Sequence, residues 1–70
     1  MFNTKEVCAI IDYKAMREIR DGYDMHAIFL KEIRDAVENS SKNDYALSEV
    51  DWFLEADPNT HNMSNYIAFI

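Results

Sequence analysis

The sequence contains a single cysteine, a single glycine and a single proline. One cysteine, Cys8, cannot form an intramolecular disulfide, which excludes a disulfide-stapled secreted scaffold. One glycine, Gly22, cannot build the glycine-rich loop that cradles a phosphate, so nucleotide binding is not expected. The sequence also lacks the pattern of a signal peptide and any apolar run long enough to span a membrane. We therefore expect a soluble, cytoplasmic protein.

Basic residues are scarce as well. Seven lysines and arginines stand against thirteen aspartates and glutamates, which gives a formal net charge of −6 at pH 7. A field of this sign repels nucleic-acid backbones and anionic lipid surfaces, so we expect no direct binding to either. The same field attracts cationic surfaces and would accelerate encounter with a basic partner protein.

Residues that could carry catalysis are few and scattered. His26 lies close to Asp24 in the sequence, but general acid–base catalysis needs a positioned constellation, and none is indicated. Cys8 falls among apolar residues, where a free thiol packs as a small hydrophobe. Cys8, His26 and His61 do not have the short spacing of a zinc site. We predict no catalytic site, no metal site and no cofactor.

The remaining composition is that of a folded domain. Hydrophobic residues make up 49% and charged residues 29% of the 70 residues. A chain of this length buries about 60% of the surface that it exposes when unfolded, which suffices for one small core and not for two. We therefore expect residues 1–70 to form a single domain.

Apolar residues in the first third of the chain recur with helical spacing. Asn3 and Glu6 have the spacing of a capping box, which predicts a helix that begins at Asn3 or Thr4. Gly22 follows the periodic stretch, where a glycine commonly ends a helix in the left-handed conformation. The predicted apolar stripe consists of Val7, Cys8, Ile11, Ala15 and Ile19.

A second helix is indicated from Met25 to about Asn39, with Asp24 as its N-cap. Only residues 22–24 separate it from the first helix, so we expect the two to form an antiparallel hairpin around a shared core. Residues 40–43 are small and polar, which predicts a surface loop. The apolar stripe of the second helix comprises Phe29, Leu30, Ile33, Ala36 and Val37.

Residues 44–56 fit a helix better than a strand. Ser48 and Asp51 have the spacing of a capping box, and Pro58 follows the end of the segment. In a strand, Phe53 would fall on the acidic side, which argues against that alternative. As a helix, the segment would turn to the core Ala46, Leu47, Val50, Phe53 and Leu54.

The end of the chain allows two structures. Residues 66–70 are apolar, aromatic and β-branched, which suits either a short helix or a terminal strand. The sequence as a whole predicts an all-α domain of three or four helices, built on an N-terminal antiparallel helical hairpin. The alternative is an α+β domain with a C-terminal β-hairpin.

Charge is distributed unevenly along the chain. Residues 41–70 contain one basic residue, Lys42, and five carboxylates. On a helical wheel, the carboxylates and aromatic residues of the segment 44–56 fall mostly on the side away from the predicted core. Aromatic anchors flanked by carboxylates are typical of a surface that binds a basic partner. The predicted partner-binding residues are Asp44, Tyr45, Glu49, Asp51, Trp52 and Glu55.

This surface has a plainer interpretation. Trp52 could pack beneath residues 66–70, and the carboxylates could simply form a solvated helix face, because a domain of this size needs its aromatic residues in the core. The two interpretations differ in the exposure of the indole and in whether the carboxylates pair with cations of the same chain.

The sequence therefore favours a non-enzymatic protein that binds a basic surface of a partner protein. If that surface normally holds nucleic acid, the chain would act as an inhibitor or regulator by charge mimicry. Short, acidic helical chains without motifs are common among phage and mobile-element proteins that block a host factor, which supports this function by analogy only. The alternative is a structural module that self-associates as a symmetric homodimer through Ile10, Met16, Ile28 and the C-terminal apolar residues.

Overall fold

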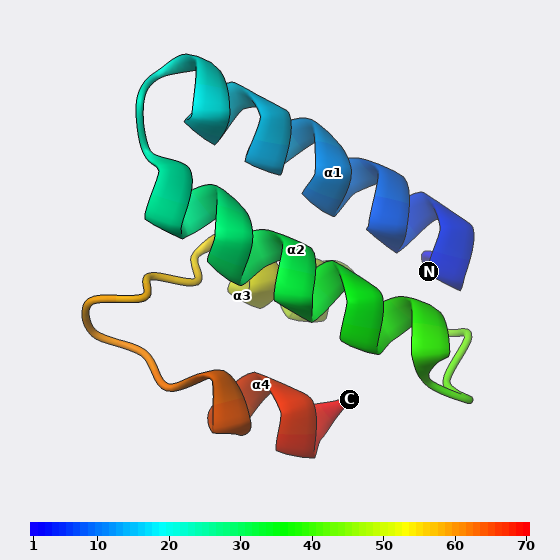
Figure 1. Cartoon of the computed structure of the whole chain (residues 1–70). Helices are drawn as coiled ribbons and strands as arrows, with labels where there is room; N and C mark the ends of the chain where they lie inside the picture. The colour runs from blue at the N-terminus through cyan, green and yellow to red at the C-terminus, as the bar shows by residue number, and fades with distance from the viewer.

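The computed structural model describes all 70 residues and consists of four helices without a β-sheet. The helices are α1 (Thr4–Arg20), α2 (Asp24–Asn39), α3 (Leu47–Leu54) and α4 (Met63–Phe69). α1 and α2 run antiparallel, α3 lies behind α2, and α4 lies on the side of α2 away from α1 (Figure 1). The predicted all-α fold built on a helical hairpin is confirmed, and no strand forms the β-hairpin of the alternative.

The predicted ends of α1 are both present. The Asn3 side chain accepts a hydrogen bond from the Glu6 N–H at 2.9 Å, and the Glu6 carboxylate accepts one from the Asn3 N–H at 3.0 Å. At the other end, Gly22 adopts φ 88°. The Tyr23 N–H then donates to the Glu18 carbonyl and the Gly22 N–H to the Ile19 carbonyl, which is the Schellman pattern. Gly22 thereby turns the chain directly into α2.

The N-cap predicted for α2 is wrong by one residue. Asp24 is the first helical residue, and the N-cap is Tyr23, whose side chain makes no capping hydrogen bond. Tyr23 already closes the Schellman motif of α1, so the tight turn and not a side-chain cap fixes the start of α2. Asp24 instead places its carboxylate in the first turn, where the helix dipole favours negative charge.

Most of the two predicted stripes face each other in the hairpin. Val7, Ile11 and Ala15 of α1 are fully buried, as are Ile33 and Val37 of α2. The exception is at the C-terminal end of α1, where Ile19 is 47% exposed instead of buried. Ile19 lies one residue before the end of α1, next to the turn that leads into α2.

α3 is shorter than the predicted segment 44–56. Tyr45 is extended and forms an antiparallel bridge with Phe2, with both hydrogen bonds at 2.8 Å, so the helix begins only at Leu47. The predicted capping pair is also wrong: Ala46 is the N-cap, and its N–H donates to the Glu49 carboxylate at 3.2 Å. Leu47, predicted in the core, is 60% exposed.

α4 shows that the C-terminal end is a helix and not a strand. Asn62 caps it by accepting a hydrogen bond from the Ser64 N–H at 3.1 Å. Tyr66 is the buried residue of this helix and packs edge-on against Phe29 of α2, with ring centroids 5.8 Å apart. All 14 buried residues of the chain belong to one hydrophobic cluster, to which each of the four helices contributes.

Candidate functional site

Three of the six predicted partner-binding residues lie together on the outward side of α3. Asp51 and Glu55 are exposed one helical turn apart, and Trp52 between them is partly exposed. Ser48, which is also exposed, completes a spacing of i, i+3, i+4 and i+7 on this side. We call these four residues, Ser48, Asp51, Trp52 and Glu55, the acidic face of α3.

The other three predicted residues lie elsewhere. Tyr45 is 0% exposed, because its main chain pairs with Phe2 and its ring enters the core. Its side chain is therefore not available to a partner. Asp44 is exposed but belongs to the loop before α3. Glu49 lies on the side of α3 that faces Lys42 and forms an ion pair with it.

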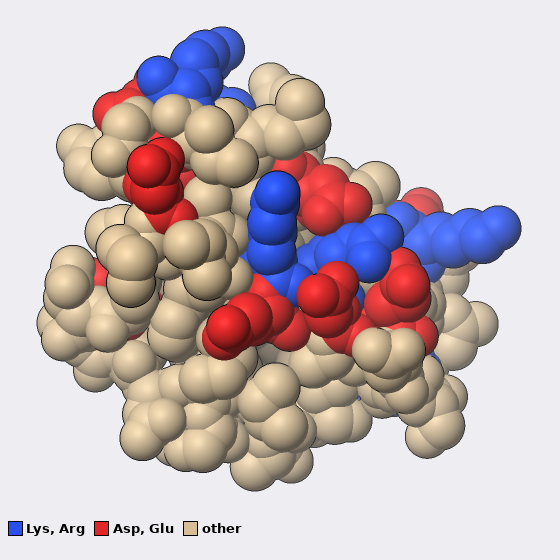
Figure 2. Space-filling model, in the orientation of Figure 1, with Lys and Arg blue, Asp and Glu red and all other residues tan.

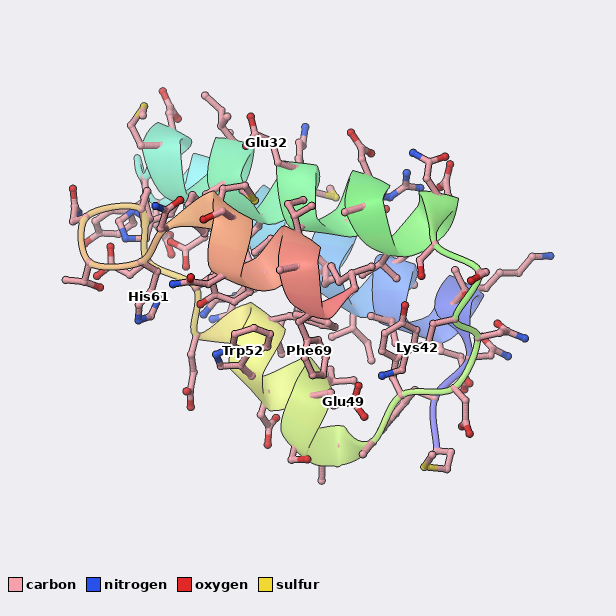
Figure 3. All side chains as sticks on the ribbon, turned by 90° about the horizontal axis from the view of Figure 1, so that it is seen from below. Glu32, Lys42, Glu49, Trp52, His61 and Phe69 are labelled. Carbon is pink, nitrogen blue, oxygen red and sulfur yellow. The ribbon has the colours of Figure 1, made fainter.

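Lys42 makes several contacts on the side of α3 that carries Glu49, away from the acidic face. Its ammonium pairs with Glu49 and lies 4.9 Å from the ring centroid of Tyr45 and 4.8 Å from that of Phe69. Figure 3 shows Lys42, Glu49 and Phe69 close together below α4. The hydrogen bond from Lys42 holds the pKa of Glu49 below its ordinary value, and the Ala46 N–H adds to this effect. Glu49 is thus a structural carboxylate engaged within the chain.

The indole of Trp52 is fixed in place by α4. It stacks on the Tyr66 ring, with centroids 4.3 Å apart and an interplanar angle of 23°, and meets the Phe69 ring edge-on at 5.1 Å. Trp52 and Phe69 lie side by side in Figure 3. The plainer interpretation of the sequence expected this packing, yet the indole is only partly buried. A ring held in one orientation loses little conformational entropy on binding.

The carboxylates of the acidic face differ from most others in the chain. Eight of the thirteen carboxylates contact a lysine, arginine or histidine side chain or, for Glu6, accept a hydrogen bond at a helix cap. Residues 43–70 contain no lysine or arginine at all. On the face seen in Figure 2, charges of both signs intermingle over α1 and α2, while the surface over α4 carries none. The five carboxylates without such a partner are Asp24, Glu32, Asp44, Asp51 and Glu55.

A groove of about 680 Å³ lies between α1 and α2. Arg34 crosses it and pairs with Asp12 at 3.2 Å and with Glu38 at 2.6 Å. Cys8 lines the groove and is almost fully buried, with its thiol 3.7 Å from the Arg34 carbonyl oxygen. Burial raises the pKa of the Cys8 thiol, which keeps it protonated and unreactive at neutral pH.

The two histidines both contact the loop that precedes α4: His26 reaches it from α2, and His61 lies within it. His26 Nε2 lies 3.5 Å from the Asp57 carboxylate, whereas its predicted neighbour Asp24 forms no ion pair. His61 Nδ1 accepts a hydrogen bond from the Asp57 N–H at 3.1 Å and contacts the Tyr66 hydroxyl at 2.9 Å. Burial raises the pKa of Tyr66. These contacts tie the loop to α2 and α4.

No three histidine, cysteine, aspartate or glutamate side chains are grouped so that they could hold a metal ion. None of the four helices has the combination of length and apolar character that crossing a membrane requires. Comparisons with protein-family models, curated proteins and solved structures found no match. The acidic face of α3 must therefore be interpreted from its own geometry.

Proposed function

We propose that this chain is a non-enzymatic binding module that occupies a basic surface of a partner protein with the acidic face of α3. The observation that carries the proposal is that Asp51 and Glu55 have no cationic partner within the chain and flank a fixed, partly exposed indole. Tryptophan is enriched among residues that dominate binding energy, and unpaired carboxylates steer a basic surface toward it.

The helix itself gains from such a partner. Two carboxylates at i and i+4 repel each other and destabilise a helix by a few tenths of a kcal/mol. Asp51 and Glu55 have this spacing, and no lysine or arginine of α3 or α4 offsets their repulsion. A basic partner surface would remove the repulsion and add charge-assisted hydrogen bonds to both carboxylates.

The proposed role is that of an inhibitor or regulator. A surface that binds nucleic acid is basic, and two carboxylates beside an aromatic ring offer it both negative charge and a stacking plane in place of phosphate and base. The proposed place of action is the cytoplasm, which suits a chain whose one thiol has no partner for a disulfide.

A matched pair of double variants tests the proposal. Asp51→Asn with Glu55→Gln removes two charges from the acidic face, whereas Asp24→Asn with Glu32→Gln removes two unpaired charges from α2. Each variant is used as bait in a cell lysate, and captured proteins are identified by mass spectrometry. We expect at least one basic protein to bind the wild type and the α2 variant but not the α3 variant.

The same complex then tests charge mimicry. Adding single-stranded or double-stranded DNA should release the partner if the acidic face occupies a nucleic-acid site. Identical sets of captured proteins for the wild type and the α3 variant would show that this face is not the binding surface.

A further inference from the structure

The outward side of α1 is the counterpart of the acidic face. Tyr13, Met16, Arg17 and Arg20 line a groove of about 250 Å³, and Tyr13 and Met16 are 66% and 67% exposed. The Arg17 guanidinium lies over the Tyr13 ring at 5.9 Å and has no carboxylate partner. Arg20 reaches only Asp21, at 3.7 Å and in solvent. We call these four residues the basic face of α1.

The two faces have the same helical spacing. The basic face occupies positions 13, 16, 17 and 20, and the acidic face occupies positions 48, 51, 52 and 55, so both follow i, i+3, i+4 and i+7. In a parallel alignment, Met16 would meet a carboxylate, Asp51. In an antiparallel alignment the opposed pairs are Tyr13 with Glu55, Met16 with Trp52, Arg17 with Asp51, and Arg20 with Ser48.

Each pair of the antiparallel alignment is chemically complementary. A thioether against an indole is a favourable sulfur–aromatic contact. A guanidinium opposite a carboxylate makes a charge-assisted hydrogen bond, and a phenol hydroxyl or a second guanidinium can donate to the remaining carboxylate and hydroxyl. From this match we propose that a second copy of the chain docks its acidic α3 face antiparallel on the basic face of α1.

Such a contact joins different surfaces of the two copies. It therefore either extends into an open chain with one free face at each end or, where both faces of two copies can meet at once, closes into a ring. Four residues on each side bury much less than the roughly 800 Å² per partner of a standard interface, so the association is weak, with a dissociation constant between about 0.1 and 1 mM. This goes beyond the proposed function, because it gives α1 a role and makes a second copy a competitor for the acidic face.

Charge reversal at the central pair tests the contact. Arg17→Glu sets a carboxylate opposite Asp51, and Asp51→Arg sets a guanidinium opposite Arg17. Each single variant should raise the dissociation constant by about tenfold in sedimentation velocity. The double variant, which restores opposite charges with the original net charge, should recover most of the association. A mixture of the two single variants should recover it as well.

Net charge alone gives a different result. Arg17→Glu makes the chain more acidic and Asp51→Arg makes it less acidic, so a general charge effect would change association in opposite directions. Lys31→Glu and Glu32→Arg are the matched controls, because both residues are exposed on α2 without an ion partner. They should leave the dissociation constant within about twofold of the wild type.

Two results would overturn the proposal. They are a wild-type mass that stays at 8.2 kDa up to about 1 mM, and a double variant that associates no better than the single ones. Failure here leaves the proposed function intact, since Arg17→Glu should still capture the basic partner. Conversely, loss of partner capture in the Asp51→Asn/Glu55→Gln variant does not depend on self-association.

Discussion

The helical hairpin and the segment that follows it differ in how many of their charged side chains form ion pairs within the chain. In α1 and α2, Arg34 alone engages Asp12, Asp35 and Glu38, and Lys14 pairs with Glu18. Residues 43–70 contain no lysine or arginine; of their five carboxylates, Glu49 pairs with Lys42, just before them, and Asp57 with His26 of α2. The hairpin engages most of its carboxylates within itself, whereas Asp44, Asp51 and Glu55 of the later segment have no such partner.

The two regions also contribute different kinds of side chain to the core. The hairpin contributes mainly aliphatic side chains, while the later segment contributes rings: Tyr45 and Phe53 meet edge-on at 5.9 Å, and Trp52 stacks on Tyr66. Both sets nevertheless form one cluster. The regions are therefore distinct in surface chemistry but should be inseparable in stability, and the following predictions examine that contrast.

The largest effect is expected from Phe53→Ala. Phe53 is fully buried at the centre of the ring cluster, so its removal should cost about 3–5 kcal/mol in the free energy of unfolding. Urea unfolding followed by far-UV circular dichroism measures the loss. Leu47→Ala, on the exposed side of the same helix, should change stability by less than about 0.5 kcal/mol. A hairpin that kept its helicity after α3 had unfolded would contradict the single core.

Substitutions at the helix caps of the two regions should change the free energy of unfolding by about 1 kcal/mol, with opposite signs. Asn3 caps α1 through its side chain, so Asn3→Ala should destabilise the protein by about 1 kcal/mol. Ala46, the N-cap of α3, has the required extended backbone but no side-chain acceptor. Ala46→Ser should therefore stabilise by roughly 0.5–1 kcal/mol. Thermal unfolding of both variants checks the opposite signs, and equal signs would disprove the assignment of the caps.

Two buried tyrosines should respond differently to loss of their hydroxyl groups. The Tyr45 hydroxyl is buried without a hydrogen-bond partner, so Tyr45→Phe should be neutral or stabilising by up to about 1 kcal/mol. The Tyr66 hydroxyl contacts His61, so Tyr66→Phe should destabilise by about 1 kcal/mol. Chemical denaturation of the two variants in parallel gives the comparison, and a destabilised Tyr45→Phe protein would indicate a partner for that hydroxyl.

The smallest expected effect is a loss of stability in acid, and the carboxyl groups responsible for it should lie in the later region. Hydrogen bonding from Lys42 lowers the pKa of Glu49, and hydrogen bonding from the Asn59 N–H lowers that of Asp57. A carboxyl with a depressed pKa stabilises the fold above its ordinary pKa, and this contribution disappears as the pH falls through the lowered value. Stability should therefore decline between about pH 5 and pH 3. Glu49→Gln should flatten this decline, as measured by urea midpoints across the range.

Sequence patterns located the hairpin almost to the residue because its signals are local. A capping box of four residues and one glycine fix the ends of α1, and a periodic stripe identifies α2. The start of α3 depends instead on Phe2, 43 positions before Tyr45, and no local pattern reports that pairing. A helix extended back to Tyr45 would place the tyrosine ring on the solvent side. Pairing with Phe2 makes this residue extended instead, and its ring lies in the core.

The candidate site was predictable only where the helix is regular. Asp51, Trp52 and Glu55 keep their predicted side because they lie within or at the cap of α3. Helical spacing alone places Glu49 with these residues. Its partner Lys42 lies in the loop before α3, so the spacing of the helix does not reveal the ion pair. Phe69 and Tyr66, which hold the indole, come from a segment whose secondary structure the composition left open.

The bridge between Phe2 and Tyr45 also couples the beginning of the chain mechanically to α3. Two hydrogen bonds attach it to the residue that directly precedes the cap of α3. Tension applied at Met1 is therefore shared between the covalent path into α1 and this lateral link. A tether fused at that end would pull on the segment that orients Asp51 and Glu55, whereas one fused after Ile70 would load α4 first.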